Sequence, residues 1–319
     1  MARGSLQYWQ KRRAYRRLPR VRNYFSDSKE PSIVGIVGYK AGMTHATVAI
    51  AGKQEEARAC TIIEVPRIEA YGIRLYKKER GTGYKKILKE FHDKNSAQRA
   101  GVKKSDDYNA ESAKALLSET VDVSVLMAAY PKGMATGQHH PDRFESHISG
   151  KDIAKKFELA NGILGKEIKP GDIFKEGEHT DIITITKGKG WAGVIKRFGV
   201  ARLNHKATQK IRHVGVLGSF GIGRVLYSVP QSGQLGFNYR TEQNKRILKI
   251  GRKEDVESIN PKSGFINYGK VKSDFIIIDG SVGGPAKRLV RIRKSITNVD
   301  SKGIKEAKVT YIATTERSL

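Results

Sequence analysis

The chain has 319 residues and carries 60 Lys and Arg against 32 Asp and Glu, a formal net charge of +28 at pH 7. An excess of this size indicates a polyanionic partner, with nucleic acid as the first candidate. The one cysteine excludes intramolecular disulfides and argues against a secreted, disulfide-stapled scaffold. No apolar stretch approaches the ~20 residues that a membrane span needs, and the basic N-terminus is not followed by the apolar region of a signal peptide. We therefore expect a cytoplasmic protein with no membrane partner.

The charge is distributed unevenly along the chain. Residues 90–180 hold 15 acidic and 13 basic side chains, which leaves this block close to neutral. The positive excess lies in the first 30 residues, in a long stretch from Thr186 to Arg252, and near the C-terminus. This distribution predicts a globular body with basic extensions that reach into a polyanion.

Residues 1–30 are predicted to form a basic arm. No acid precedes Asp27, and the aromatic residues Trp9, Tyr15 and Tyr24 are mixed with the cations. This pattern is typical of segments that become ordered on RNA, with rings stacked on bases, although a solvated, flexible tail is the alternative. The arm residues expected to bind RNA are Arg3, Lys11, Arg12, Arg13, Arg16, Arg17, Arg20 and Arg22.

Short strands are predicted directly after this arm. Residues 32–50 and 57–76 are apolar, rich in β-branched side chains and interrupted by glycines, and Pro66 ends or interrupts one of the strands. Cys60 lies in the strand-like run ACTIIEV, which predicts a buried, chemically inert thiol.

The middle of the chain mixes helix and strand signals. Residues 109–120 predict a short helix, residues 121–130 a strand, and residues 131–148 a loop with glycines and histidines. A second helix is expected to follow, with Ser149 as its N-cap and Gly162 as its C-terminal stop.

Strands are predicted again in the second half. We expect a strand–turn–strand over residues 163–174, with Pro170 and Gly171 at the turn, another strand pair over 181–199, and three strands over 263–296. Many short strands at even spacing favour a closed or nearly closed β-barrel. The basic stretch between these strands is then a long excursion from the barrel, and such loops are usually functional.

This basic stretch contains no acid between Asp181 and Glu242. Its glycines allow close backbone approach to RNA, while Phe220, Tyr227 and Tyr239 can stack on bases. Phe220 is interpreted as a contact at the tip in preference to a small local core. The expected RNA-binding residues here are Lys187, Lys189, Lys196, Arg197, Arg202, His205, Lys206, Lys210, Arg212, His213, Arg224, Tyr239, Arg240, Lys245 and Arg246.

No catalytic, metal or cofactor site is predicted. The glycine clusters near Lys187 and Lys166 lack the spacing of a phosphate-binding loop. His139, His140 and His147 match no metal-ligand spacing and are interpreted as surface or RNA-facing side chains. A small-molecule substrate is therefore not expected.

Several long motifs resemble one family, the universal large-subunit ribosomal protein three family in its archaeal and eukaryotic form. The matching runs are ARGSLQYWQKRRAYRRLPR near the N-terminus, GYKAGMTH at 38–45, TKGKGWAGVIKRFG at 186–199, GVLGSFGIGRV at 215–225, SVPQSGQLGFNYRTEQNKRI at 228–247 and FINYGKVKSDFIIIDGSVGGPAKRLVRIRKS at 265–295. The resemblance covers most of the chain except about 70–150.

The resemblance implies a mainly β fold with some α: a six-stranded translation-protein-type β-barrel with an α/β insertion and two long RNA-penetrating extensions. It implies a structural protein of the large ribosomal subunit that binds large-subunit rRNA, helps nucleate assembly, contacts neighbouring ribosomal proteins and has no catalytic role. The implied division is an N-terminal arm at 1–30, first barrel strands at 31–69, an insertion and return at 70–180, barrel strands at 181–199, the excursion at 200–262 with its tip near 218–223, and final strands and tail at 263–319.

The resemblance also assigns residues at the tip, which in the family approaches the peptidyl-transferase centre. The tip residues are Gly218, Ser219, Phe220 and Gly221. Phe220 takes the place of the tryptophan of many relatives, which removes an indole N–H donor. Arg212 matches the arginine of the tip strand, Thr208 stands where eukaryotic relatives carry a modified histidine, and Gly283 replaces a usual proline.

Two other functions remain as alternatives. An RNA-modifying or RNA-processing enzyme would need a nucleophile, metal site or cofactor loop, and none is readable. A nucleic-acid chaperone or chromatin-type protein would be expected to carry randomly distributed basic residues. Acid-free segments with aromatic residues around a neutral body fit that class less well.

Overall fold

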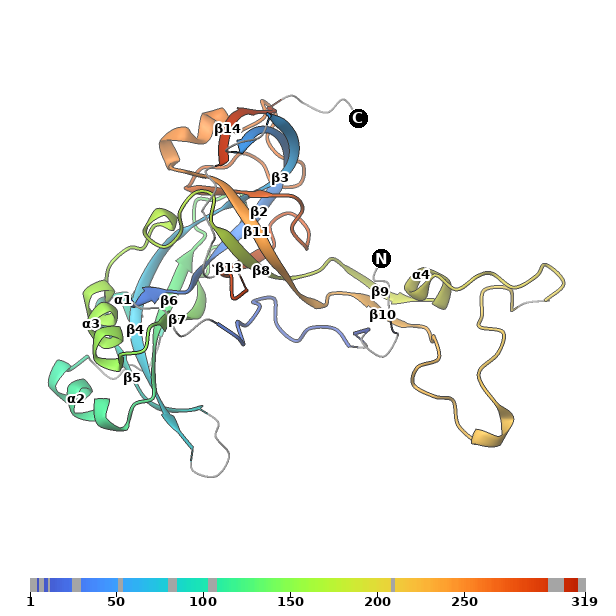
Figure 1. Ribbon diagram of the computed structural model, residues 1–319, viewed down its shortest axis with the longest axis horizontal. Helices are drawn as coiled ribbons and strands as arrows, with labels where there is room; N and C mark the ends of the chain where they lie inside the picture. Colours follow the sequence, from blue (N-terminus) through green and yellow to red (C-terminus); the bar gives the residue numbers. More distant parts are fainter. Residues whose placement is uncertain are drawn as a thin grey trace. The chain divides into compact units, whose positions relative to one another are not determined.

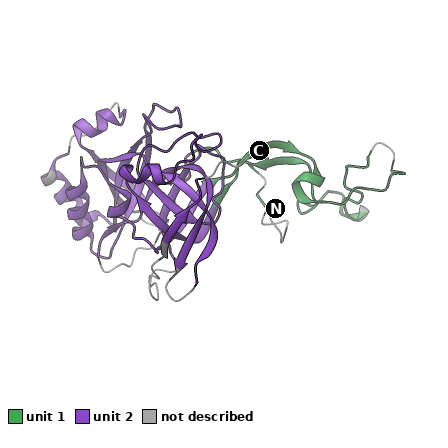
Figure 2. Ribbon diagram, turned by 90° about the horizontal axis from the view of Figure 1, so that it is seen from above, with its two compact units in different colours: residues 1–17, 185–240 green, residues 18–184, 241–319 purple. Residues whose placement is uncertain are grey.

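The computed structural model describes residues 5, 9–10, 12–24, 30–50, 54–79, 85–102, 108–207, 210–297 and 307–314. Within them the chain divides into two compact units, shown in Figure 2: unit 1 is Met1–Arg17 with Ile185–Arg240, and unit 2 is Leu18–Thr184 with Thr241–Leu319. No helix of the described part is long and apolar enough to cross a membrane.

The described elements follow one another as strands with a few short helices (Figure 1). The strands are β1 (Ser32–Ile33), β2 (Gly35–Ile50), β3 (Glu56–Glu64), β4 (Arg67–Lys78), β5 (Lys85–His92), β6 (Asp122–Tyr130), β7 (Asp142–Ser149), β8 (His179–Ile185), β9 (Gly188–Ala192), β10 (Gly233–Gly236), β11 (Tyr239–Gly251), β12 (Phe275–Asp279), β13 (Leu289–Lys294) and β14 (Ala307–Ile312). The helices are α1 (Lys94–Arg99), α2 (Ala110–Ala115), α3 (Ile153–Ile163) and α4 (Val194–Phe198), with 3₁₀ turns η2 (Leu116–Glu119), η3 (Pro170–Asp172), η4 (Phe220–Ile222) and η5 (Lys253–Ser258).

Unit 2 is built on two antiparallel sheets. The larger has the strand order β13-β8-β11-β12-β3-β2-β14, and β13 also pairs with β2, so β13 has β8 on one side and β2 on the other. The smaller sheet has the order β1-β7-β6-β4-β5, with α3 packed on β6 and α1 on β4. The fold is therefore mainly β with some α, as the sequence predicted.

One hydrophobic core joins the two sheets. Ile62 and Phe275 of the larger sheet and Ile73 and Met127 of the smaller sheet are fully buried in the same cluster. In β12 the run FIIID is buried at its first four positions, because it pairs with β3 on one side and β11 on the other. Burying such side chains stabilises the fold by about 1.5–3 kcal/mol each.

The predictions for the first half of the chain are largely confirmed. β2, β3 and β4 form where the β-branched runs lie, with Pro66 between β3 and β4. The predicted strand at 121–130 is β6, and the predicted helix at 109–120 is α2 followed by η2. Cys60 is fully buried in β3, and this burial raises the pKa of its thiol to about 12, as expected for an inert cysteine.

The predicted start and stop of the second helix are wrong. Ser149 is the last residue of β7, where it pairs with Ser32, and the N-cap of α3 is Asp152. Gly162 lies inside α3, which continues to Ile163. β7 begins at Asp142, so the predicted loop over 131–148 is a loop only in its first part. Strand pairing with β1 outweighs the local capping preference of Ser149.

Other strand predictions are also corrected. Residues 163–174 form no strand pair: Glu167 makes a single bridge to Glu69, and residues 170–172 form η3. β8 and β9 do not pair with each other, because β8 lies between β13 and β11 while β9 pairs with β10. Residues 263–296 contain two strands, β12 and β13, in place of the three predicted.

Candidate nucleic-acid interface

Unit 1 contains a two-stranded ribbon, β9 with β10. The register pairs Gly233 with Ala192 and Gln234 with Trp191, and it shifts before Gly236 meets Gly188. Gly236 has φ +73°, and a Cβ there would lie 2.0 Å from the carbonyl oxygen of Lys187. Only glycine fits this close backbone approach. The glycines of the basic stretch therefore build the ribbon itself, in addition to any approach to RNA.

The N-terminal segment packs against this ribbon. The backbone N–H of Ala14 donates to the carbonyl of Phe237 at 2.7 Å, and the Asn238 side-chain amide donates to the carbonyl of Arg12 at 2.9 Å. The ring of Trp9 stacks on Phe198 with 4.7 Å between centroids. The start of the predicted arm and the predicted excursion therefore form one composite surface within unit 1.

This surface has no counter-charge of its own. Unit 1 holds 16 Lys and Arg and no Asp or Glu among its 73 residues. At close spacing such cations repel one another, and a bound polyanion relieves the repulsion.

Most predicted RNA-binding side chains are exposed. In unit 1 the exposed ones are Arg12, Arg13, Arg16, Arg17, Lys187, Lys189, Lys196, Arg202, His205, Lys206, Lys210, Arg212, His213 and Arg224. In unit 2 Arg20 and Arg22 are exposed as well. These side chains can reach phosphate without disturbing the packing beneath them.

The remaining predicted side chains are less accessible. Tyr239 and Arg240 of unit 1 and Lys245 and Arg246 of unit 2 are half-buried. Lys245 also lies 3.7 Å from a carboxylate oxygen of Glu242. A half-buried cation that already faces a carboxylate, as Lys245 does, contributes less to phosphate binding than an exposed one.

Arg197 is the clearest exception among the predicted contacts. It is 7% exposed, and its Nη1 donates to the main-chain carbonyl of Gln231 at 2.8 Å. A Cβ on Gly233 would come within 2.7 Å of this guanidinium nitrogen, so the glycine makes room for it. Burial lowers the pKa of Arg197 from its ordinary value. Arg197 therefore links α4 to the segment before β10.

At the predicted tip, Gly218, Ser219 and Gly221 are exposed, and η4 begins at residue 220. The side chain of Phe220 lies outside the described residues, and so do Arg3, Lys11 and Thr208.

Exposed aromatic side chains add to the cationic surface. Trp191 of β9 is 78% exposed and Tyr227 is 71% exposed. Trp191 was not among the predicted contacts, although it lies in the acid-free stretch two residues after Lys189. An exposed indole in such a stretch is the signal that would have identified it, since soluble proteins rarely expose tryptophan without a partner.

The histidines considered as possible metal ligands, His139, His140 and His147, lie in β7 and in the loop before it. Within the described part of the chain, no group of three or more His, Cys, Asp or Glu is placed to hold a metal ion. His139 and His140 are exposed in the loop before β7. His147 is half-buried in β7 with its ring stacked 3.9 Å from that of Tyr24, so it is neither a surface nor an RNA-facing side chain.

In unit 2 the predicted arm residue Tyr24 belongs to a buried polar cluster. Asp122 accepts hydrogen bonds from Lys156 at 2.9 Å, from Lys85 at 2.7 Å and from the Tyr24 hydroxyl. Burial alone would raise the pKa of Asp122, but these three donors lower it to about 2. The carboxylate is thus held ionised, and its partners are satisfied inside the protein.

Comparisons with a family model and with curated proteins point to the same family. The sequence model of the family described as Ribosomal protein L3 matches residues 1–318. Among similar curated proteins is the large ribosomal subunit protein uL3 of Methanobrevibacter smithii, 37% identical over 326 residues, which cover 98% of this chain and 96% of that protein. The protein of the same name from Methanocaldococcus jannaschii is 38% identical over 327 residues, 99% and 96% of the two chains. That of Nanoarchaeum equitans is 37% identical over 298 residues, 92% and 90%. The chain therefore belongs to the ribosomal protein L3 family.

Proposed function

We propose that the chain is a structural constituent of the large ribosomal subunit in the cytoplasm, where it binds large-subunit rRNA, helps nucleate subunit assembly and touches neighbouring ribosomal proteins. As a member of the ribosomal protein L3 family it is a structural ribosomal protein and not an enzyme. The reading as an RNA-modifying or RNA-processing enzyme finds no support in this family.

The observation that carries the proposal is the composition and exposure of unit 1. Its 16 cations have no carboxylate within the unit, and most of those described are exposed. Each phosphate that such a cation neutralises releases a condensed counterion, which provides most of the affinity for RNA. Trp191 and Tyr227 add ring faces for stacking on bases.

The proposal extends to the finer architecture. The strands β2, β3, β12, β11, β8 and β13 would form the six-stranded translation-protein-type barrel, and the pairing of β13 with both β8 and β2 supports closure. The smaller sheet with α1 to α3 would be the α/β insertion. The limits of unit 1 favour an excursion from Ile185 to Arg240 in place of the predicted 200–262, since β11 carries residues 241–251 into the larger sheet.

Unit 1 would serve as the RNA-penetrating part of the molecule. In this proposal its residues 218–221 extend toward the peptidyl-transferase centre, as the resemblance to the family implies. The exposure of Gly218, Ser219 and Gly221 is compatible with that role.

The salt dependence of rRNA binding tests the proposal. The affinity of the full chain for deproteinised large-subunit rRNA should fall steeply with salt, with log affinity losing about 0.7–0.9 per phosphate contact for each tenfold rise in salt. Sedimentation at high salt should find the protein with the large ribosomal subunit. A flat salt dependence, or loss from the subunit at moderate salt, would contradict the proposal.

A further inference from the structure

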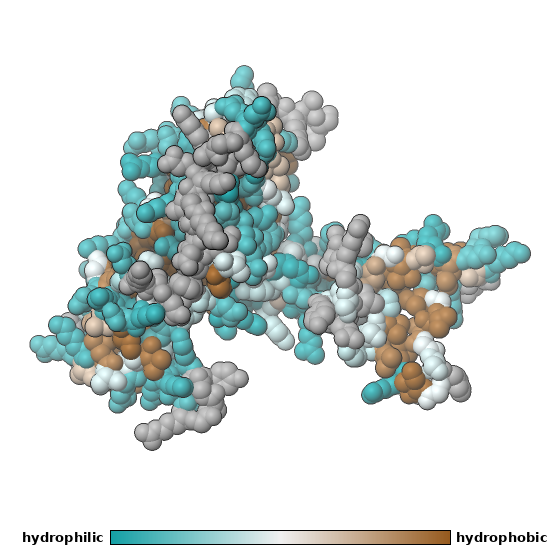
Figure 3. Space-filling view, viewed as in Figure 1, coloured by the Kyte–Doolittle hydropathy of each residue, from teal (hydrophilic) through white to brown (hydrophobic). Residues whose placement is uncertain are grey.

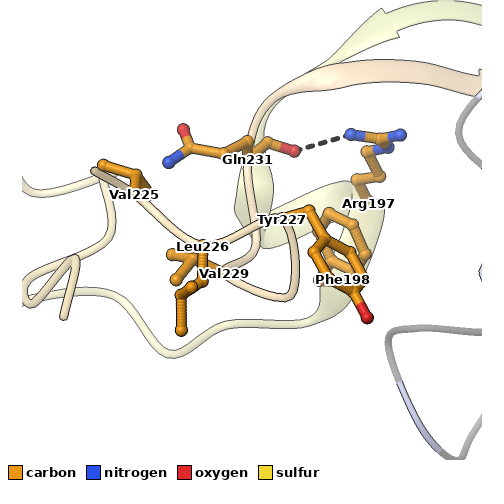
Figure 4. A pocket seen from close by; sticks show the side chains of 7 residues that line it. All are labelled: Arg197, Phe198, Val225, Leu226, Tyr227, Val229 and Gln231. Atoms are coloured by element: carbon orange, nitrogen blue, oxygen red, sulfur yellow. Dashed lines mark hydrogen bonds between the residues drawn. The ribbon is translucent and has the colours of Figure 1, made fainter. Parts of the chain in front are cut away.

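A groove of about 340 Å³ opens in unit 1 between α4 and the segment that leads into β10 (Figure 4). It is lined by Arg197, Phe198, Val225, Leu226, Tyr227, Val229 and Gln231. Its size lies at the lower end of the range for small-molecule pockets, about 300–1,000 Å³. Figure 3 shows hydrophobic side chains gathered on this part of the chain. The exposed apolar residues there include Val216, Leu217, Ile222, Val225 and Leu226.

One wall of the groove is rigid. Phe198 is the last residue of α4, and its ring stacks on Trp9 and lies 4.9 Å from the Arg197 guanidinium. Arg197 is itself fixed by its hydrogen bond to the Gln231 carbonyl, drawn as a dashed line in Figure 4. These contacts hold an aromatic ring, an arginine plane and a carbonyl in one arrangement.

The other wall is open to a partner. Tyr227 is 71% exposed, Val225 48% and Leu226 40%, so apolar and aromatic surface faces solvent at the groove. The side-chain amide of Gln231 points away from Arg197 in Figure 4, and it offers both a donor and an acceptor at the rim. Solvent exposure of this surface is unfavourable until a partner covers it.

We propose that this groove binds one unpaired nucleobase of the large-subunit rRNA. The inference rests on the proposed function, which it deepens by naming the group that fills this site. The base stacks on the ring of Tyr227 or Phe198 and packs against Leu226, while Gln231 reads a polar edge of the base. The surrounding cations hold its phosphate backbone.

Charge complementarity favours a nucleobase over an apolar protein segment. The groove lies in a unit with 16 cations and no acid, so an apolar peptide would have to dock within a strong positive field without neutralising it. An RNA strand supplies both a flat base, which can occupy the groove, and a phosphate, which can pair with the surrounding cations. Aromatic platforms flanked by Lys and Arg are the usual arrangement for single-stranded RNA.

The test compares affinities of full-chain variants for deproteinised large-subunit rRNA over a salt series. Tyr227→Ala should weaken binding about 5- to 100-fold, the range for losing one base–aromatic stack. The slope of log affinity against log salt should not change, because tyrosine carries no charge. Tyr227→Phe should restore binding. Tyr311→Ala, which removes a 57% exposed tyrosine from β14 of unit 2, is the matched control and should bind as the wild type does.

Any result other than the expected one overturns the inference. Unchanged affinity of Tyr227→Ala would exclude a base in the groove, and loss of a neighbouring protein from subunits built with that variant would then identify a protein segment as the occupant. A weaker slope, or failure of Tyr227→Phe to restore binding, would exclude stacking. If the affinity of the wild type for rRNA does not depend on salt, the proposed function itself fails. If the wild-type affinity falls steeply with salt and Tyr227→Ala binds equally well, only the inference about the groove fails.

Discussion

The two units of this chain are stabilised in opposite ways. Unit 2 has 44 Lys and Arg with 32 Asp and Glu, and it buries a large hydrophobic core between two sheets. Unit 1 has 16 Lys and Arg with no acid, and its described aromatic and aliphatic side chains include many exposed ones. Unit 2 therefore has what a domain needs to fold alone, whereas unit 1 lacks the counter-charges that its partner would supply.

Two buried acids of unit 2 have their hydrogen-bond partners inside the protein. Glu64 is fully buried and accepts hydrogen bonds from the backbone N–H groups of Lys272 and Ser273 and from the Tyr268 hydroxyl. Asp181 is fully buried and pairs with Arg293, whose Nη2 lies 2.9 Å away. Buried carboxylates with partners fix one arrangement of strands, whereas the cations of unit 1 have no acid within their own unit.

The largest effect is expected from breaking the buried pair of unit 2. Asp181→Ala should lower the free energy of unfolding by about 3–5 kcal/mol, because it leaves Arg293 charged, buried and without its carboxylate. Denaturant titration at pH 7 measures it. Lys155→Ala is the control, since it removes a surface pair with Asp152 and should cost under about 1 kcal/mol. Equal losses in the two variants would contradict the distinction between buried and surface charge.

The second prediction concerns the free charge of unit 1. Replacing Lys187, Lys189, Arg202 and Lys206 by glutamine should lower the slope of log affinity for rRNA against log salt by about 3. The loss of affinity between 50 and 200 mM salt should then be about 100-fold smaller than in the wild type. The matched control neutralises four exposed cations of unit 2, Lys151, Lys155, Lys166 and Lys175, and should leave the slope unchanged. Equal changes in both variants would mean that binding follows net charge and not unit 1.

The third prediction tests whether unit 1 has a local structure of its own. Gly236→Ala places a Cβ against the Lys187 carbonyl at positive φ and should destabilise the β9–β10 ribbon by about 2 kcal/mol. Hydrogen exchange over residues 187–192 and 233–236 measures this loss. Gly221→Ala is the control, because a Cβ there meets nothing within 4 Å. Fast exchange of the ribbon in the unmodified protein would contradict a preformed unit 1.

The sequence predicted the parts of the molecule that depend on local patterning. β2 to β4 and β6 follow β-branched runs, and the buried state of Cys60 follows from its place in such a run. The acid-free stretch and its cations could also be predicted from the sequence, because charge needs no knowledge of tertiary contacts. Whether these cations bind RNA stays a prediction.

The errors have a common physical cause, which is contact between segments far apart in sequence. Ser149 lost its capping role to a strand pairing with Ser32, more than a hundred residues away. Arg197 was predicted to contact phosphate, but it is buried and donates to the carbonyl of Gln231, 34 residues later. The contacts of Gln10, Arg12 and Ala14 with residues 237–239 could not be predicted either, because nothing in either segment alone specifies the other.

The smallest predicted effect comes from His147, where Tyr24 meets the body of unit 2. Burial lowers the pKa of His147 to about 4, although Glu145 and Asp122 nearby oppose this shift, while Arg291 and Lys85 add to it. The unfolded chain has the ordinary pKa of about 6.5 and binds the proton more readily, so stability is complete above pH 6.5 and falls as the pH drops toward 4.

Between pH 6.5 and 5 the free energy of unfolding should fall by about 1 kcal/mol on account of His147, a value discounted for its partial exposure. This window stays above the titration of Asp122, whose pKa is about 2. His147→Gln keeps a polar side chain beside Ser124 but cannot titrate, and its unfolding free energy should change less over the same window. Denaturant titrations at the two pH values measure the difference. Identical pH dependence in both proteins would mean that the ring is as accessible to protons in the folded state as in the unfolded chain.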